Sequence, residues 1–85
     1  MAVVLLPAVL AAEAGGKKRF DVDAPTVGDA LQQLPVRNLL FDEAGELRRL
    51  INVYVDGVDA RGGRLLEERL EAQSVVRIVG AVAGG

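Results

Sequence analysis

Residues 50–56 show the clearest alternation of apolar and polar positions in the chain. Ile, Val and Val fall on one face, while Asn, Tyr54 and Asp fall on the other, and a period of two predicts a strand with one buried face. The Asp-Gly pair that follows is typical of a two-residue hairpin turn, so we expect a short returning strand over 58–61. Residues 75–79 are predicted as the last strand, with an arginine on its solvent face.

Two further strands are predicted near the N-terminus. Residues 3–10 are rich in Val and Leu, which favours a buried strand. Pro7 is unusual there, because proline donates no backbone hydrogen bond, and we interpret it as the place where pairing in this strand ends or changes. Residues 17–23 alternate again, and a turn over 11–16 with two adjacent glycines would join both strands into a hairpin.

The segment after this hairpin carries the signals of a short helix. Thr26 is a good N-cap residue, and Asp29 follows three residues later, as in a capping box. Four apolar residues repeat with the spacing of one helical face: Val27, Ala30, Leu31 and Leu34. Pro35 limits how far the helix continues, and a helix this short must be held by packing on a sheet.

The rest of the chain is less regular. We expect a short apolar segment at 39–41, a turn at 42–45 and a short helical turn within 64–71. The order of elements predicts one α+β domain, a mixed sheet of four to five strands with one main helix on one face. The first and last strands would lie side by side in its centre, with a right-handed crossover through the helix. We divide the chain into this domain, residues 1–80, and a flexible C-terminal tail, residues 81–85.

Composition excludes several kinds of chemistry. The 85 residues contain no cysteine and no histidine, so the chain has no thiol nucleophile, no disulfide, and neither the commonest general base nor the commonest metal ligand. The net charge of −2 gives no electrostatic footprint for nucleic acid. Paired carboxylates occur at 21/23, 42/43 and 67/68, but such pairs are mostly solvated surface. We therefore expect no catalytic residue, no metal site and no enzyme activity of its own.

The apolar N-terminus admits a second interpretation, a secretory signal. Residues 3–12 are nearly all apolar, and the Ala-Glu-Ala at 12–14 imitates a small-residue cleavage site. However, no Lys or Arg precedes the apolar run, as the positive region of a signal would require, and the run is too short to span a bilayer. We therefore favour a buried strand and, because disulfides are absent, a cytoplasmic protein that does not bind membranes.

The five C-terminal residues, 81–85, carry no charge and end in Gly84-Gly85. Chain ends are often small and disordered, but a diglycine end lacks Cβ atoms, so it can enter a narrow channel with its terminal carbonyl unshielded. Its carboxylate could attack the α-phosphate of ATP to give an acyl-adenylate, and a sulfur nucleophile could then displace AMP and leave a thiocarboxylate. A partner enzyme would supply the ATP site, Mg²⁺ and electrostatic stabilisation.

Four segments of the chain carry a resemblance to a known family: residues 4–10 with the glycine pair that follows, residues 51–57, residues 59–63, and the Ala-Val-Ala-Gly-Gly end. In these segments the sequence resembles the ThiS/MoaD family of β-grasp sulfur carriers, and most closely the branch that serves cysteine biosynthesis and related pathways. The resemblance implies a β-grasp, or ubiquitin-like, fold. It also implies that Gly85 is the residue that is adenylated and converted to a thiocarboxylate.

The resemblance implies partners as well. Gly84 and the segment Ala81, Val82 and Ala83 would enter the active site of a ubiquitin-activating-like adenylyltransferase. That enzyme would use the ATP, so the carrier itself would bind no cofactor. A sulfide donor or sulfurtransferase would load the tail, and a sulfur-accepting biosynthetic enzyme would receive the sulfur.

Two positions depart from the family's pattern. Residues 71–74 are Glu-Ala-Gln-Ser where the family usually has an Asp-Gly-Asp turn, which puts the local turn in doubt. Gly80 stands where a proline often precedes the tail, which should loosen the tail. Neither departure changes the terminal carboxylate.

Tyr54 is the candidate docking residue for the activating enzyme, because it points away from the apolar face of its strand. The alternative is a partly exposed tyrosine that packs on its own sheet. Arg61 and Arg77 could add contacts at the rim of such a surface, although exposed arginines usually need no special role.

Three other functions stay open at this point. A ubiquitin-like modifier would be joined to lysines of other proteins, and the small subunit of a molybdopterin-synthase-type complex would co-purify with a large subunit. A plain interaction domain would function unchanged after one residue was added beyond Gly85.

Overall fold

The computed structural model describes residues 1–48, 51–59 and 65–80 of the chain. In these residues one sheet contains the strands β1 (Ala2–Leu5), β2 (Arg19–Val22), β3 (Ile51–Val55), β4 (Val58–Asp59) and β5 (Val75–Gly80). The helices are α1 (Ala8–Glu13), α2 (Val27–Gln32) and α3 (Arg37–Leu40), and a 3₁₀ turn, η1, spans Leu65–Glu67.

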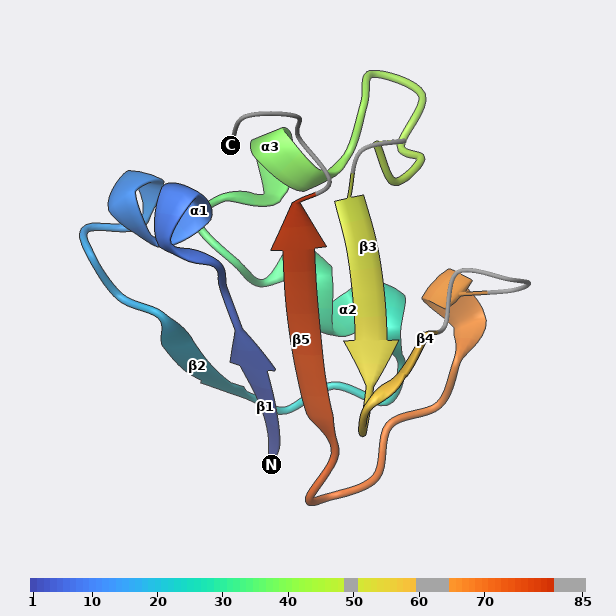
Figure 1. Cartoon of the computed structure of the whole chain (residues 1–85). Coiled ribbons are helices and arrows are strands. Elements are labelled where there is room, and N and C mark those ends of the chain that lie inside the picture. The colour runs from blue at the N-terminus through green and yellow to red at the C-terminus, as the bar shows by residue number, and fades with distance from the viewer. Residues whose placement is uncertain (49–50, 60–64, 81–85) are drawn as a thin grey trace.

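The order of strands in the sheet is β2-β1-β5-β3-β4 (Figure 1). β1 and β5 run parallel, and the other neighbouring pairs run antiparallel. The predicted mixed sheet is therefore confirmed, with the first and last strands adjacent at its centre. The predicted Asp-Gly hairpin is confirmed too, since Asp56 and Gly57 between β3 and β4 both have positive φ, 52° and 86°, as a type I′ turn requires.

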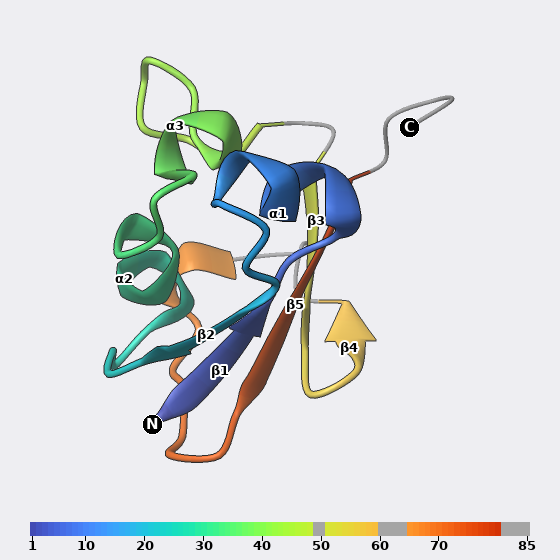
Figure 2. The ribbon, with the colours of Figure 1, turned by 90° about the vertical axis from the view of Figure 1, so that its left-hand side faces the viewer.

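The helix α2 covers one face of the sheet, and Figure 2 shows α2 and α3 on the same side. The four residues predicted for its apolar face are fully buried: Val27, Ala30, Leu31 and Leu34. They share one core with strand residues such as Val4, Val53 and Val76. Each buried Leu or Val side chain contributes about 1.5–3 kcal/mol relative to exposure, so this layer holds the short helix in place. The predicted cap is confirmed, because the Thr26 hydroxyl accepts a hydrogen bond from the backbone N–H of Asp29 at 3.2 Å.

The prediction of one strand over residues 3–10 is wrong. β1 ends at Leu5, and α1 begins after Pro7, whose carbonyl accepts hydrogen bonds from the N–H groups of Leu10 and Ala11. A continuous apolar run does not distinguish a buried strand from a buried helix, and the alanines after Pro7 favour the helix. Pro7 does mark the end of strand pairing, as predicted. The predicted turn over 11–16 is confirmed only at its C-terminal end, where two glycines have positive φ. Its first three residues belong to α1.

Two other segments differ in detail from their predictions. Residues 39–41 were predicted as a short apolar segment, and the structure places the first two of them in α3, where Leu40 is buried. The predicted turn at 42–45 is confirmed by a hydrogen bond from the N–H of Gly45 to the carbonyl of Asp42. The helical turn predicted within 64–71 is present as η1. The returning strand over 58–61 is present as β4, and its last two residues lie outside the described part of the chain.

The turn before β5 is closed by Ser74, although its sequence departs from the family's pattern. The Ser74 hydroxyl accepts a hydrogen bond from the N–H of Glu71 at 2.9 Å, and the N–H of Ser74 donates to the carbonyl of Glu71 at 3.1 Å. The Ser74 carbonyl then accepts from the N–H of Val3 at 2.9 Å. Ser74 is buried, so this polar residue both closes the turn and fixes β5 against β1.

Candidate functional site

The face of the sheet opposite α2 carries no helix in the described part of the chain, and it faces the viewer in Figure 1. Side chains alternate along a strand, so β5 buries Val76 and Ile78 toward the helix and exposes Val75, Arg77 and Val79. We call this surface the open face, and on its three central strands, β1, β5 and β3, the residues that form it are Val3, Leu5, Asn52, Tyr54, Val75, Arg77 and Val79.

The strand register sets these side chains in rows across the sheet. Leu5 of β1 is opposite Arg77 of β5, and Arg77 is opposite Tyr54 of β3. Residues directly opposite one another point to the same face, so the three form one row, which Arg19 of β2 continues on the other side of Leu5. Leu5 and Tyr54 are half-buried and Arg77 is exposed. The predicted orientation of Tyr54, away from the buried residues of its strand, is therefore confirmed.

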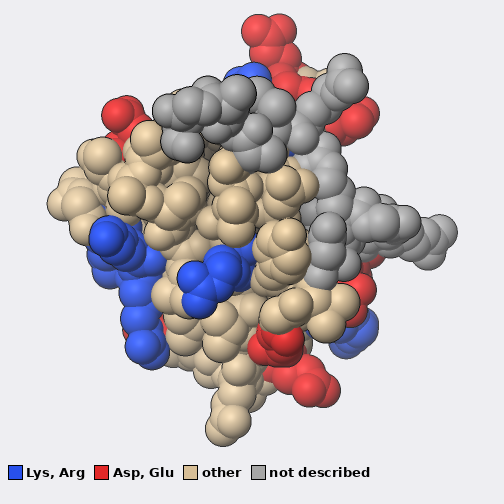
Figure 3. Space-filling view, viewed as in Figure 1, with Lys and Arg blue, Asp and Glu red and all other residues tan. Residues whose placement is uncertain are grey.

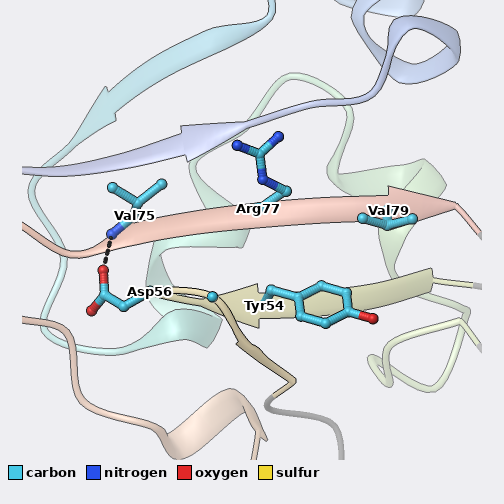
Figure 4. A pocket seen from close by; sticks show the side chains of 6 residues that line it. Tyr54, Asp56, Val75, Arg77 and Val79 are labelled. Atoms are coloured by element: carbon cyan, nitrogen blue, oxygen red, sulfur yellow. Dashed lines mark hydrogen bonds between the residues drawn. The ribbon is translucent and has the colours of Figure 1, made fainter.

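A shallow hollow lies on the open face along β3 and β5 (Figure 4). Its lining residues are Tyr54, Asp56, Gly57, Val75, Arg77 and Val79. In Figure 4 the Tyr54 ring extends along β3, while the Arg77 side chain leans toward β1 and away from that ring. One Asp56 carboxylate oxygen accepts a hydrogen bond from the N–H of Val75 at 2.9 Å, so this carboxylate is held at the end of the hollow.

Charges are unevenly placed on this side of the molecule. In Figure 3 one basic side chain is surrounded by uncharged surface near the middle of the view, other basic side chains lie at the left, and acidic side chains lie below the central one and around the margins. Arg19 of the edge strand β2 is 3.4 Å from Asp21 in an exposed ion pair. Among the described residues, Arg77 has no such partner. Within the described residues, the centre of the open face therefore combines an arginine that has no acidic partner with apolar neighbours.

The predicted reactive tail starts where β5 ends. Gly80 is the last described residue, and it is opposite Ile51 at the end of the sheet where β1 leads toward α1. The predicted adenylation residue Gly85 and the tail residues Ala81, Val82, Ala83 and Gly84 lie outside the described residues, as does Arg61. Their assignments stay predictions.

The described residues bring no group of three carboxylate side chains together that could hold a metal ion. In the described ranges, no helix is both long enough and apolar enough to cross a bilayer. What the described surface offers is an open apolar face with an aromatic residue and a cation, which suits contact with another protein.

Arg77 was predicted from the sequence to lie at the rim of a docking surface. The exposed positions 75, 77 and 79 could be read from the alternation in β5, but the central place of β5 needed the strand order.

Comparison with known proteins adds the family. The model of the ThiS family matches residues 4–85 of this chain. The sulfur carrier protein CysO of Mycobacterium tuberculosis is 30% identical over 89 residues, which cover 96% of each chain. The crystal structure of Mycobacterium tuberculosis CysO superposes with a TM-score of 0.85 at 27% identity, over 96% of this chain and 100% of that one. These matches span nearly the whole chain, and the β-grasp, ubiquitin-like fold is shared.

Two other solved structures are informative. One is the complex of BexX and CysO from Amycolatopsis orientalis, with a TM-score of 0.85 and 28% identity over the full length of both chains. The other is SAMP1 from Haloferax volcanii, with a TM-score of 0.77 and 35% identity over 99% of this chain and 98% of that one. The first structure is that of a carrier of this fold bound to another protein.

Proposed function

Because the chain belongs to the ThiS family, we propose that it is a sulfur carrier protein whose working group is the carboxylate of Gly85. The observation that carries this proposal is the extent of the similarity. The family model covers residues 4–85 and so includes the diglycine end, and the similarity to CysO covers 96% of both chains. The carrier catalyses no step itself, because the reactive chemistry belongs to its partners.

The proposed reaction has two steps, both of which involve the carboxyl group of Gly85. A carboxylate oxygen of Gly85 attacks the α-phosphorus of ATP, pyrophosphate leaves, and an acyl-adenylate forms. Hydrosulfide then attacks the carbonyl carbon, AMP leaves with the bonding electron pair, and the thioacid loses its proton to leave a thiocarboxylate. The glycines at 84 and 85 let the terminal carboxyl group pass through a narrow channel of the enzyme, since neither has a Cβ to obstruct it. The adenylating enzyme would contribute the ATP site, Mg²⁺ and charge stabilisation.

This reaction requires three kinds of partner, and the carrier itself binds no cofactor. A ubiquitin-activating-like adenylyltransferase would use the ATP, a sulfide donor or sulfurtransferase would supply the sulfur, and a biosynthetic enzyme would accept it. The complex of BexX with CysO from Amycolatopsis orientalis supports the general idea that such carriers act by binding a second protein. We place this exchange in the cytoplasm.

The open face is the surface that we assign to the adenylating enzyme, with Tyr54 as its aromatic contact. Tyrosine is enriched in protein interfaces, because its ring buries a large apolar area while its hydroxyl keeps a polar partner. Tyr54 is half-exposed next to the exposed Val79 and Val75. A largely apolar surface that leads to the end of β5 would let the enzyme bind the domain while residues 81–85 enter its active site.

A protein modifier is the second candidate, and the similarity to SAMP1, the small archaeal modifier protein 1, favours it. In that case the activated carboxylate of Gly85 would be attacked by a lysine amine of another protein in place of sulfide. The two functions differ in their products. Intact mass spectrometry of the activated chain detects a thiocarboxylate, whereas digestion of cell extracts detects isopeptides that end in Gly84-Gly85.

A further inference from the structure

Arg77 is a charged residue in the middle of an apolar surface. It lies on β5, the third of the five strands. Its neighbours on the same face along β5 are Val75 and Val79, and its neighbours across the sheet are Leu5 and Tyr54. Four apolar or aromatic residues therefore surround one cation. This position is the centre of the open face, not the rim.

The Arg77 guanidinium has no acidic partner among the described residues. The contrast with Arg19 is direct, because Arg19 lies opposite Leu5 on its other side and has Asp21 at 3.4 Å. Asp56 lines the same hollow as Arg77, but one of its oxygens is engaged with the N–H of Val75. Of the two arginines in this row, Arg77 is thus the one whose charge is left for another molecule.

An unpaired arginine at the centre of an apolar face restricts what can cover it. A partner that buried the guanidinium without supplying an acceptor would leave a desolvated charge, which is strongly unfavourable. A carboxylate satisfies it best, because the planar guanidinium fork matches two carboxylate oxygens. Arginine and tyrosine are also the residues in which binding energy at interfaces is concentrated.

We propose that Arg77 is the specificity-determining residue of the open face, and that the adenylating enzyme presents a carboxylate to it within an otherwise apolar docking surface. This inference rests on the proposed function, because it specifies how the proposed partner recognises this chain. The apolar residues supply buried area, and the Arg77–carboxylate pair rejects surfaces that lack an acidic group at this place. The ion pair acts on binding and leaves the chemistry at Gly85 unchanged.

The test uses the full chain and the adenylating enzyme of the same organism, with thiocarboxylate formation followed at varied carrier concentration. Arg77→Glu places a second carboxylate opposite the first, and we expect the KM for the carrier to rise by about tenfold or more with kcat unchanged. Arg19→Glu is the matched control, since it makes the same change of charge in the same row. Its KM should stay within about twofold of the unmodified value, because Arg19 is already paired.

Arg77→Gln serves as a second variant, with circular dichroism to verify that each variant folds. It should raise KM less than Arg77→Glu does, and added salt should weaken binding of the unmodified chain more than that of Arg77→Gln. An unchanged KM for both Arg77 variants would overturn the inference and leave the proposed function standing. Equal rises for Arg77→Glu and Arg19→Glu would also overturn it, because net charge alone would explain them. If an active enzyme failed to adenylate the unmodified chain, the proposed function itself would fail.

Discussion

Asp56 and Val75 exchange two hydrogen bonds across the base of β3 and β5. The N–H of Asp56 donates to the Val75 carbonyl at 2.8 Å, and the N–H of Val75 donates to the Asp56 carboxylate at 2.9 Å. Asp56 is also the one non-glycine residue with positive φ in the described part of the chain. The side chain therefore performs a backbone role, since it pairs the first N–H of β5 where the β3 backbone turns away.

We expect Asp56→Ala to destabilise the domain by about 1–2 kcal/mol, because the N–H of Val75 loses its acceptor and alanine tolerates positive φ poorly. Asp56→Asn is the control, since its amide oxygen can accept the same hydrogen bond and asparagine adopts positive φ readily. Urea unfolding followed by circular dichroism measures both. Equal stability of the alanine variant and the unmodified chain would show that this hydrogen bond contributes nothing.

Thr26→Ala removes the N-cap of α2. The lost hydrogen bond to the N–H of Asp29 should cost about 1 kcal/mol. Thr26→Ser keeps the hydroxyl and should preserve most of the stability. A lower urea midpoint for alanine than for serine is the expected result, and the reverse order would mean that the threonine methyl group matters more than the cap.

Gly28→Ala tests the contact between α2 and η1. In an open helix this change stabilises by up to about 1 kcal/mol. Here an added Cβ would lie 2.9 Å from the carbonyl oxygen of Leu66, so we expect destabilisation by about 1–3 kcal/mol from overpacking. Gln32→Ala, on the exposed side of the same helix, controls for helix propensity. A stabilising Gly28→Ala would mean that η1 shifts freely away from α2.

The tail prediction separates function from stability. One alanine added after Gly85 should abolish thiocarboxylate formation, because the activated carboxylate would no longer belong to the terminal glycine. The midpoint of urea unfolding should stay unchanged, since the addition follows the last strand. One alanine added before Met1, which is 70% exposed, is the control for chain extension. Undiminished thiocarboxylate formation by the C-terminal variant would contradict the assignment of Gly85.

The sequence predicted those parts of the fold in which local signals and burial agree. Thr26, Asp29 and the apolar spacing that follows specify α2, and all four predicted core residues are fully buried. The sequence failed at α1, because the residues on both sides of Pro7 are equally apolar and no alternation separates strand from helix. In that segment the proline and the alanines decide the structure.

The candidate site was predicted less completely than the fold. The orientation of Tyr54 followed from alternation within one strand. The central position of Arg77 depends on two other strands, because Leu5 and Tyr54 become its neighbours through pairing across the sheet. No pattern within β5 contains that information.

The most direct test of the central claim is intact-protein mass spectrometry after incubation with ATP, the adenylating enzyme and sulfide. We predict a mass increase equal to the replacement of one oxygen by sulfur, located at Gly85 by fragmentation and absent from a chain that lacks Gly85. An unmodified mass for the full chain, with an enzyme shown to be active on another carrier, would contradict the account.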